Sequence, residues 1–201
     1  MTRAETYENR LRKNEWEVRN APLKEGKDFI RAHHYARGCS NTAVYCHGLY
    51  RKGDDALRGV VLWLPPTRVA CESVNKIEWK KVLSLSRMAV DPDVPKNACS
   101  FLLARSVRLI EREARFVSLV TYADESQGHE GGVYRAAGWD FVGRMKGSPR
   151  WVCPKSGRQV AKKSTTTRTD AQMRDLGYEM TGVFAKHKFV KHLHQDGRDL
   201  V

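Results

Sequence analysis

The sequence predicts an α/β fold in which a mixed, twisted central sheet is flanked by helices and followed by a basic C-terminal extension. Two observations favour this class. Strand-like and helix-like segments alternate along the first 143 residues. In addition, residues 116–124 form an almost continuous apolar run that ends at Asp124, as expected of a strand buried on both faces.

The first part of the chain is expected to hold a strand, a helix and a hairpin. Alternation predicts the strand at residues 15–19, and apolar spacing predicts the helix at residues 24–35, ending near Gly38. Two strand-like runs, 42–50 and 57–64, are joined by a polar turn, which is typical of a hairpin. The polar segment that follows shows no clear period.

The middle of the chain supplies another strand and a long helix. A period of two over residues 82–90 places Leu83, Leu85 and Arg87 on one face of the strand. Asn97 is a suitable N-cap for the helix that follows. The apolar stripe of this helix consists of Leu103, Val107, Ile110 and Ala114.

After the run at 116–124, a short helix through Val133 and Tyr134 is predicted to end at Gly138, where a left-handed C-terminal cap is expected. A further strand follows at residues 139–142. Residues 1–143 are therefore interpreted as the catalytic core.

Residues 144–201 differ from the core in charge. They hold thirteen Lys and Arg against five Asp and Glu, a net +8 in a chain of net +13. This surplus favours a polyanion such as double-stranded DNA over a charge that merely maintains solubility. The basic residues expected to contact DNA are Arg150, Lys155, Arg158, Lys162, Lys163 and Arg168.

The basic extension is expected to begin with a mobile, Ser/Thr-rich loop at residues 146–168. A short helix capped by Thr169 follows, and a strand at residues 183–193 completes the sheet. Alternation along this strand predicts that Lys188 is exposed, together with its other basic residues.

Composition excludes several classes of protein. No apolar run approaches the ~20 residues that a membrane-spanning helix needs, and the N-terminus lacks the apolar core of a signal peptide. We therefore expect a cytoplasmic protein without a membrane partner. The five cysteines are odd in number and never form Cys-x-x-Cys, which indicates reduced thiols and excludes zinc fingers.

Asp124 and Tyr134 are the first candidates for chemistry. Transfer of a group to an amine requires a proton acceptor for the amine and a proton donor for the leaving group. Asp124 suits the first role and Tyr134 the second, because the carboxyl edge of an open α/β sheet is where active sites form. The alternative is structural: Asp124 caps the next loop and Tyr134 packs on the sheet.

The spacing Tyr134-x-x-x-Gly138-aromatic resembles the signature of GNAT-type N-acyltransferases, in which this tyrosine often protonates the departing thiol. The coenzyme A loop of that superfamily normally carries glycines, whereas residues 95–100 contain none. Lys96, Asn97 and Ser100 could still form an anion site at a helix N-terminus. The resemblance thus implies an acyltransferase fold, and the loop makes acetyl-coenzyme A a doubtful donor.

Arg87 and the His33-His34-Tyr35 run allow two interpretations each. A buried arginine requires a partner, which is either Asp124 or a phosphate or carbonyl group of the substrate. Histidines in the last turn of a helix are stabilised by its dipole without any ligand. Alternatively, they form a histidine–carboxylate iron site with Asp124.

In combination, several short motifs resemble the Mom family of phage DNA-modification proteins, a divergent GNAT branch. The motifs are His33-His34-Tyr35, Leu85-Ser86-Arg87-Met88, Val94 to Ser100, Tyr122-Ala123-Asp124 and Val133-Tyr134. The resemblance implies conversion of DNA adenine to N6-(carbamoylmethyl)adenine, which protects phage DNA from restriction. It also implies catalytic roles for Arg87, Ser100, Asp124 and Tyr134, and an iron site at His34, Tyr35 and Asp124.

Three functions remain open from the sequence. The chain is a DNA-adenine modifier, a conventional acetyl-coenzyme A-dependent N-acetyltransferase, or a non-catalytic DNA-binding protein on this scaffold. For the modifier, the donor is either an acetyl-level precursor used with iron or a glycyl group on a carrier such as tRNA. A basic protein could bind such a carrier as a second polyanion.

Overall fold

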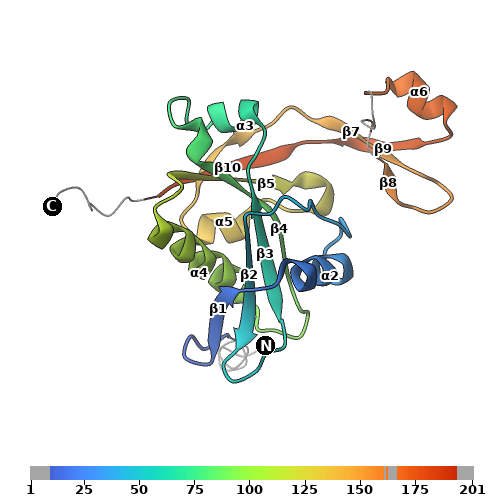
Figure 1. Ribbon diagram of the computed structural model, residues 1–201. Helices are drawn as coiled ribbons and strands as arrows, with labels where there is room; N and C mark the ends of the chain where they lie inside the picture. Colours follow the sequence, from blue (N-terminus) through green and yellow to red (C-terminus); the bar gives the residue numbers. More distant parts are fainter. Residues whose placement is uncertain (1–9, 161, 163–166, 194–201) are drawn as a thin grey trace, which may run out of the picture. The chain divides into compact units, whose positions relative to one another are not determined.

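The computed structural model describes residues 10–160, 162 and 167–193, and the chain forms two compact units (Figure 1). As far as they are described, Met1–Thr121, Gly132–Phe141 and Phe189–Val201 make up the first unit. Tyr122–Gly131 and Val142–Lys188 make up the second. The organisation expected from charge, a core at 1–143 and a DNA-contacting segment at 144–201, stays a prediction.

A seven-stranded mixed sheet has the order β1-β2-β3-β4-β5-β10-β6. Its strands are β1 (Trp16–Asn20), β2 (Tyr45–Arg51), β3 (Gly59–Leu64), β4 (Val82–Val90), β5 (Ser118–Asp124), β6 (Asp140–Arg144) and β10 (Lys186–His192). β1 to β4 are antiparallel neighbours, and β4 pairs with β5 in parallel. This is the mixed sheet that the sequence predicted.

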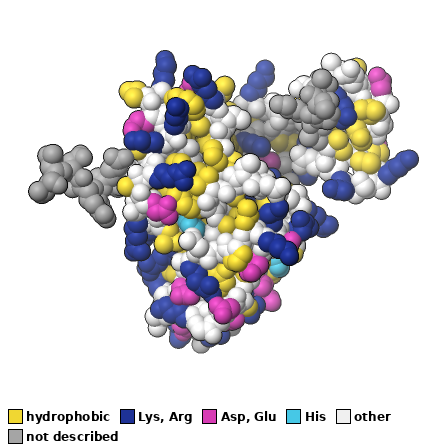
Figure 2. Space-filling model, in the orientation of Figure 1, with side chains coloured by type: hydrophobic (Ala, Val, Ile, Leu, Met, Phe, Trp, Pro, Cys, Tyr) yellow, Lys and Arg dark blue, Asp and Glu magenta, His cyan; other side chains and the backbone are white. Residues whose placement is uncertain are grey.

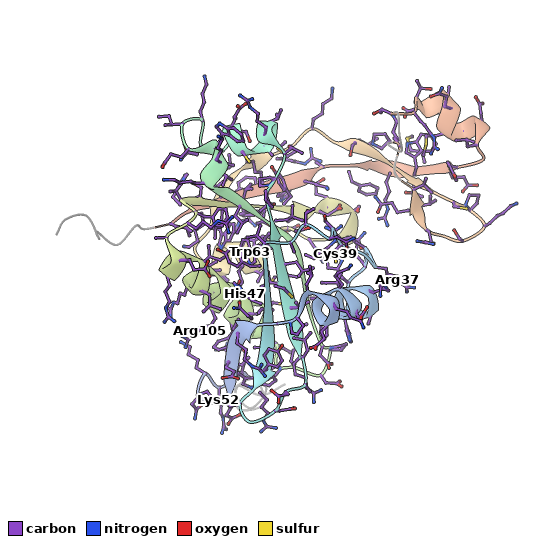
Figure 3. The ribbon with its side chains drawn as sticks, in the orientation of Figure 1. Arg37, Cys39, His47, Lys52, Trp63 and Arg105 are labelled. Carbon is purple, nitrogen blue, oxygen red and sulfur yellow. The ribbon has the colours of Figure 1, made fainter. Side chains whose placement is uncertain are left out.

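Two long helices cover opposite faces of this sheet. Leu62 of β3 packs against Ile30 of α2 (Leu23–His33), whereas the neighbouring Trp63 donates its indole N–H to Ser106 of α4 (Ala98–Glu113) at 2.8 Å. Adjacent residues of a strand point to opposite faces, so α2 and α4 lie on opposite sides. His47 and Trp63 lie between the sheet and α4 (Figure 3).

A β-bulge in β4 changes the predicted face of Arg87. Trp63 pairs with Leu85 and Leu62 pairs with Arg87, so Ser86 is the extra residue. Leu85 therefore faces α4, while Arg87 faces α2. The prediction that Arg87 shares a face with Leu83 and Leu85 is wrong, because the bulge interrupts the period of two.

The tyrosine–glycine–aromatic motif forms the end of α5 (Gly132–Ala136). The Gly138 N–H donates to the Arg135 carbonyl and the Trp139 N–H to the Tyr134 carbonyl, both at 3.0 Å. These two bonds define a Schellman cap, and Gly138 supplies the required left-handed conformation with φ of 70°. The predicted glycine cap is confirmed.

The segment predicted as a mobile loop forms part of a second sheet, of order β8-β7-β9. Its strands are β7 (Ser148–Val152), β8 (Gln159–Val160) and β9 (Glu179–Phe184). Trp151 is only 1% exposed, and the Arg174 guanidinium of α6 (Asp170–Asp175) lies 5.7 Å from the centre of its ring. The loop prediction is wrong for residues 148–152 and 159–160, because the Ser, Thr and Lys content of the segment obscured β8 and the strand β7 that carries this buried tryptophan. Residues 161 and 163–166 of the predicted loop lie outside the described residues.

The last predicted elements were partly correct. Thr169 caps α6 in a capping box with Gln172, as expected. The single strand predicted at 183–193 is instead the end of β9 followed by β10. Lys188 is 6% exposed rather than open to solvent, because β10 is an interior strand between β5 and β6.

The remaining elements are short helices. α3 (Arg68–Glu72) and the 3-10 turn η1 (Trp79–Lys81) connect β3 to β4. A second 3-10 turn, η2 (Glu125–Gln127), follows β5.

Candidate active site

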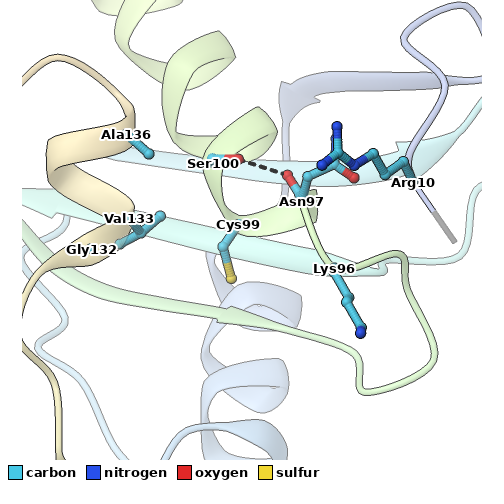
Figure 4. Close-up of a pocket in the computed structure, with 8 residues that line it drawn as sticks. All are labelled: Arg10, Lys96, Asn97, Cys99, Ser100, Gly132, Val133 and Ala136. Carbon is cyan, nitrogen blue, oxygen red and sulfur yellow. Dashed lines mark hydrogen bonds between the residues drawn. The ribbon is translucent and has the colours of Figure 1, made fainter. Parts of the chain in front are cut away.

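A pocket of about 550 Å³ lies in the first unit, between the start of α4 and α5 (Figure 4). It is lined by Arg10, Lys96, Asn97, Cys99, Ser100, Gly132, Val133 and Ala136. The pocket thus brings together the three residues that the sequence predicted as an anion site, Lys96, Asn97 and Ser100.

The first turn of α4 gives this pocket the character of an anion site. Amide N–H groups at a helix N-terminus lack intrahelical acceptors and carry partial positive charge. The Ser100 hydroxyl donates to the Asn97 carbonyl at 3.0 Å, so it rests against the same turn. Arg10 and Lys96 also line the pocket and add two full charges.

Asn97 has a second, unforeseen function. It occupies the N-cap position, but its side-chain oxygen accepts the backbone N–H of Leu11 at 2.7 Å rather than capping the helix. This bond ties the segment that carries Arg10 to the pocket. Sequence reasoning missed Arg10 because 86 positions separate Leu11 from Asn97.

Tyr134 lies on α5 between two residues that line the pocket, with its ring against Trp139 and Phe189 at centroid distances of 5.9 and 5.4 Å. Burial raises the pKa of its phenol, a hydrogen bond with Thr121 opposes this effect, and the nearby Cys99 adds to it. The phenol is therefore protonated at neutral pH, as a proton donor must be, although the raised pKa makes it a weaker acid than an exposed tyrosine.

Asp124 ends β5 in the second unit, whereas Tyr134 belongs to the first. One oxygen of its carboxylate accepts the Ser126 N–H at 3.0 Å and so caps η2. The structure therefore confirms the structural alternative, in which Asp124 caps the segment that follows β5. A role as proton acceptor stays a prediction.

Glu125, which the sequence did not single out, organises the second unit after β5. Arg144 donates to both of its carboxylate oxygens, at 2.5 and 2.9 Å. His187 lies 2.7 Å from the same carboxylate, and the Ala185 N–H donates to it at 3.2 Å. The hydrogen bond from Arg144, opposed by partial burial and helped by the other donors, lowers the Glu125 pKa to about 2.

The guanidinium of Arg87 is held by backbone carbonyls. It donates to Gly38 at 2.9 Å and to Ser86 at 2.7 Å. The first bond connects β4 to the segment that follows α2, where His34 and Tyr35 lie. Arg87 therefore has a structural function in this loop, and its contact with a substrate stays a prediction.

The geometry at His34 does not fit an iron ligand as it stands. Its Nδ1 accepts the Ala36 N–H at 3.0 Å, and its ring lies 4.3 Å from that of Tyr35. A neutral imidazole that accepts at Nδ1 carries its proton on Nε2, so neither nitrogen offers a lone pair to a metal. Ligating histidines usually show the opposite pattern, with Nδ1–H donating.

Among the described residues, no group of three or more His, Cys, Asp or Glu side chains is placed to hold a metal ion. The iron site at His34, Tyr35 and Asp124 therefore stays a prediction that requires the His34 ring to turn.

The basic residues predicted to contact DNA differ in exposure. Lys155 and Arg158 are exposed in the turn between β7 and β8. Lys162 forms an ion pair with Asp170 at 2.6 Å. Arg150 is half-buried and donates to the Ser126 carbonyl at 3.2 Å.

The set predicted to contact DNA has two further members, Lys163 and Arg168. Arg168 is half-buried, and its backbone N–H donates to the Lys162 carbonyl at 3.0 Å. Lys163 lies outside the described residues. Lys155 and Arg158 are thus the members of the predicted set best placed for a phosphate contact.

Comparison with known proteins decides the family. The model of the Mom protein family matches residues 15–195. This chain belongs to the Mom family. The family resemblance seen in the short motifs is therefore confirmed, and the match extends through the second unit.

A curated relative is the methylcarbamoylase Mom of Escherichia phage Mu, 31% identical over 124 residues. The matched region covers 58% of this chain and 49% of that protein. The chain thus spans about half the length of the curated relative that it matches.

Solved structures show the same fold at low identity. The S18-alanine N-acetyltransferase of Escherichia coli has a TM-score of 0.53 at 11% identity, covering 92% of this chain and 99% of that chain. The S5-alanine acetyltransferase of Vibrio fischeri reaches 0.54 at 10% identity, covering 93% and 97%. The chain therefore has the GNAT acetyltransferase fold.

In the described part of the chain, no helix has the length and apolar character to cross a bilayer.

Proposed function

We propose that this protein is a DNA-modifying transferase that converts adenine in duplex DNA to N6-(carbamoylmethyl)adenine and so protects phage DNA from restriction. The observation that carries the proposal is the Mom family match over residues 15–195. The name of the Mu relative, a methylcarbamoylase, is consistent with a group of this size. The basic composition of the chain is consistent with a nucleic-acid substrate.

The pocket beside α4 is proposed to bind the anionic part of the donor. Helix N–H groups, Arg10 and Lys96 are suited to phosphate. Because residues 95–100 lack the glycines that allow a backbone to approach pyrophosphate closely, acetyl-coenzyme A is not expected to be the donor on its own. A glycyl group on a carrier such as tRNA supplies two carbons and the nitrogen, and the N6-glycyl amide formed first must then rearrange to the isomeric carbamoylmethyl group. An acetyl-level precursor supplies only the two carbons, so that route also needs a nitrogen donor and an oxidation, which iron would contribute.

Tyr134 and Asp124 are proposed to move the protons. As the exocyclic amine bonds to the donor carbon, its extra proton passes to the Asp124 carboxylate, directly or through water. Tyr134 then gives its phenolic proton to the departing atom of the donor. The adenine amine is stacked inside a duplex, so the base must be extruded before either residue acts on it.

Nucleoside analysis of plasmid DNA tests this proposal. Plasmid from cells expressing the wild-type protein is digested, and adenosine derivatives are measured by mass spectrometry. We expect N6-(carbamoylmethyl)deoxyadenosine with wild type and at least ~100-fold less with Tyr134→Phe, at an unchanged melting temperature. Tyr178→Phe, a half-buried tyrosine outside the pocket, serves as matched control and should modify normally.

The outcomes separate the competing functions. Unmodified DNA with the wild-type protein contradicts the proposal, and N6-acetyladenine in its place favours conventional acetyl transfer. Full activity of Tyr134→Phe would reassign the proton donor. For the donor, purified protein and plasmid are combined with acetyl-coenzyme A or glycyl-tRNA, each with and without chelator; activity with acetyl-coenzyme A alone contradicts the interpretation of the loop.

A further inference from the structure

The outer face of α4 carries three arginines, and Glu111, three residues after the second of them, forms no ion pair with them in the described part of the chain. Arg105, Arg108 and Arg112 are spaced three and four residues apart, so they lie on one side of the helix. That side is the one turned away from the sheet, because Leu103, Val107 and Ile110 are buried on the opposite side. We call Arg105, Arg108 and Arg112 the α4 arginine row.

Within the described ranges of the chain, none of the three arginines forms an ion pair. The exposed basic residues elsewhere often do, as Arg19 with Asp55 at 2.5 Å illustrates. The acidic Glu113 of the same helix instead accepts the hydroxyl of Tyr45. The positive charge of the row is therefore available to an external anion.

One member of the row, Arg105, is held against an aromatic ring of the same helix. The Arg105 guanidinium lies 5.5 Å from the centre of the Phe101 ring, one turn earlier, and Arg105 lies on the outer side of α4 in Figure 3. Figure 2 shows basic side chains gathered along the edge of the molecule that α4 forms. Only Arg112 lies in the last turn, so the helix dipole explains at most one member of the row.

The spacing suits a nucleic-acid backbone. Seven residues of helix span about 10 Å, and each strand of a duplex carries one phosphate per about 3.4 Å of axis. Three arginines over this length match about three consecutive phosphates. Arginine binds phosphate through two parallel N–H groups, which gives orientation as well as charge.

We propose that the α4 arginine row binds the phosphate backbone of the substrate duplex DNA. The inference rests on the proposed function and adds to it a DNA contact on the unit that holds the pocket. The row begins about one turn beyond the first turn of α4, which lines the pocket. DNA held there lies along the same helix that binds the donor.

The salt dependence of binding tests the row. Affinity for a 30-base-pair duplex is measured between 50 and 300 mM salt for wild type and for the variant carrying Arg105→Gln, Arg108→Gln and Arg112→Gln. Each phosphate that the variant no longer neutralises should reduce the slope of log affinity against log salt by about 0.9, or about 3 for the three. The matched control carries Lys24→Gln, Arg51→Gln and Lys52→Gln, exposed residues that do not belong to α4; Lys52 is labelled in Figure 3. It removes the same charge and should change the slope by less than one.

The outcomes distinguish this inference from the proposed function. The inference is overturned if the salt slope of the arginine variant equals that of the wild type, or if the control variant changes the slope by the same amount. In either case the proposed function still stands, provided that the wild-type protein binds duplex DNA. The same measurement is made with an RNA duplex of the same length. If the arginine variant loses affinity for the RNA duplex but not for the DNA duplex, the row does not bind DNA. Failure of the wild-type protein to bind duplex DNA at any salt contradicts the proposed function itself. Equal melting temperatures of both variants exclude unfolding as the cause.

Discussion

The two units differ in how they are held together and in how their polar residues are exposed. In the first, a continuous apolar core encloses one polar network, in which the Ser106 hydroxyl meets His47 at 2.7 Å and Trp63 at 2.8 Å. The second unit has a small core around Trp151, and the ion pairs of Glu125 add to its stability. A large core can enclose an uncharged histidine, whereas a small unit depends on one aromatic side chain and on charge.

The proposed DNA contacts lie on both units, with the α4 arginine row on the first. The first unit also keeps the proposed proton donor Tyr134 half-buried beside the pocket, where burial raises the pKa of its phenol. The second presents Lys155 and Arg158 to solvent, which suits contact with a polyanion. Chemistry requires burial to shift a pKa, and electrostatic contact with DNA requires exposure. Each of the following predictions changes one side of this comparison.

The largest effect is expected from Trp151→Ala. Removing a fully buried indole costs about 3–5 kcal/mol, which should open the small sheet of the second unit. Hydrogen exchange should accelerate in β7 and β9 and stay slow in β4 and α4. Trp151→Phe should cost much less, because the indole N–H has no hydrogen-bond partner in the part of the chain that the structure describes. Equal acceleration in both units would show that they unfold together.

Acid should destabilise the first unit through His47. Burial lowers the pKa of His47 from 6.5 to about 4, with Glu113 acting weakly in the opposite direction. Between pH 6.5 and 4 the unfolded chain binds a proton that the folded chain does not, so stability falls by up to roughly 3 kcal/mol and then levels off. Urea unfolding at pH 7 and pH 4.5 measures the loss.

His47→Gln should flatten that pH dependence. If this variant fails to fold, NMR of the wild-type His47 ring replaces it: the ring should remain neutral at pH 5. Titration of His47 near pH 6.5 in the folded protein would contradict the prediction.

A smaller effect is expected from Lys155→Gln combined with Arg158→Gln. Both side chains are exposed in the β7–β8 turn, and each phosphate left without its basic partner should lower the salt slope of duplex binding by about 0.9. Modification by a protein saturated with DNA should be unchanged, since neither residue acts on the reacting atoms. An unaltered slope would remove the second unit from the proposed DNA interface.

The smallest effect is expected from Glu125→Gln, which keeps the shape of the side chain but removes its charge. Arg144 and His187 then lose their carboxylate, and amide exchange at Ala185 should accelerate. With a pKa of about 2, the carboxylate of the wild type gives up its stabilisation only as the pH falls from 4.5 toward 2. The protection factor of the Ala185 amide, which removes the intrinsic pH dependence of exchange, should therefore not change between pH 6.5 and 5, in contrast to the stability of the first unit.

Most elements and part of the site could be predicted from the sequence. The strands and the two long helices up to β5, the glycine cap after α5 and the cap at Thr169 follow from local patterns, whereas α3 and η1 were not predicted. Lys96, Asn97 and Ser100 were recognisable because they are neighbours in one helix turn. Arg10 was not, because nothing in its own segment indicates that Leu11 is bound by Asn97.

The sequence by itself determined the features that depend on neighbouring residues. The Tyr134–Gly138–Trp139 motif forms its cap whatever surrounds it, because the left-handed glycine and the two cap bonds are local. Only the tertiary structure decided which face of the sheet carries Arg87 and that β10 lies between β5 and β6 in the sheet. The first depends on a bulge in the pairing with β3, and the second on pairing between strands far apart in the chain. Such pairings are selected by the packing of the whole sheet, which no local pattern records.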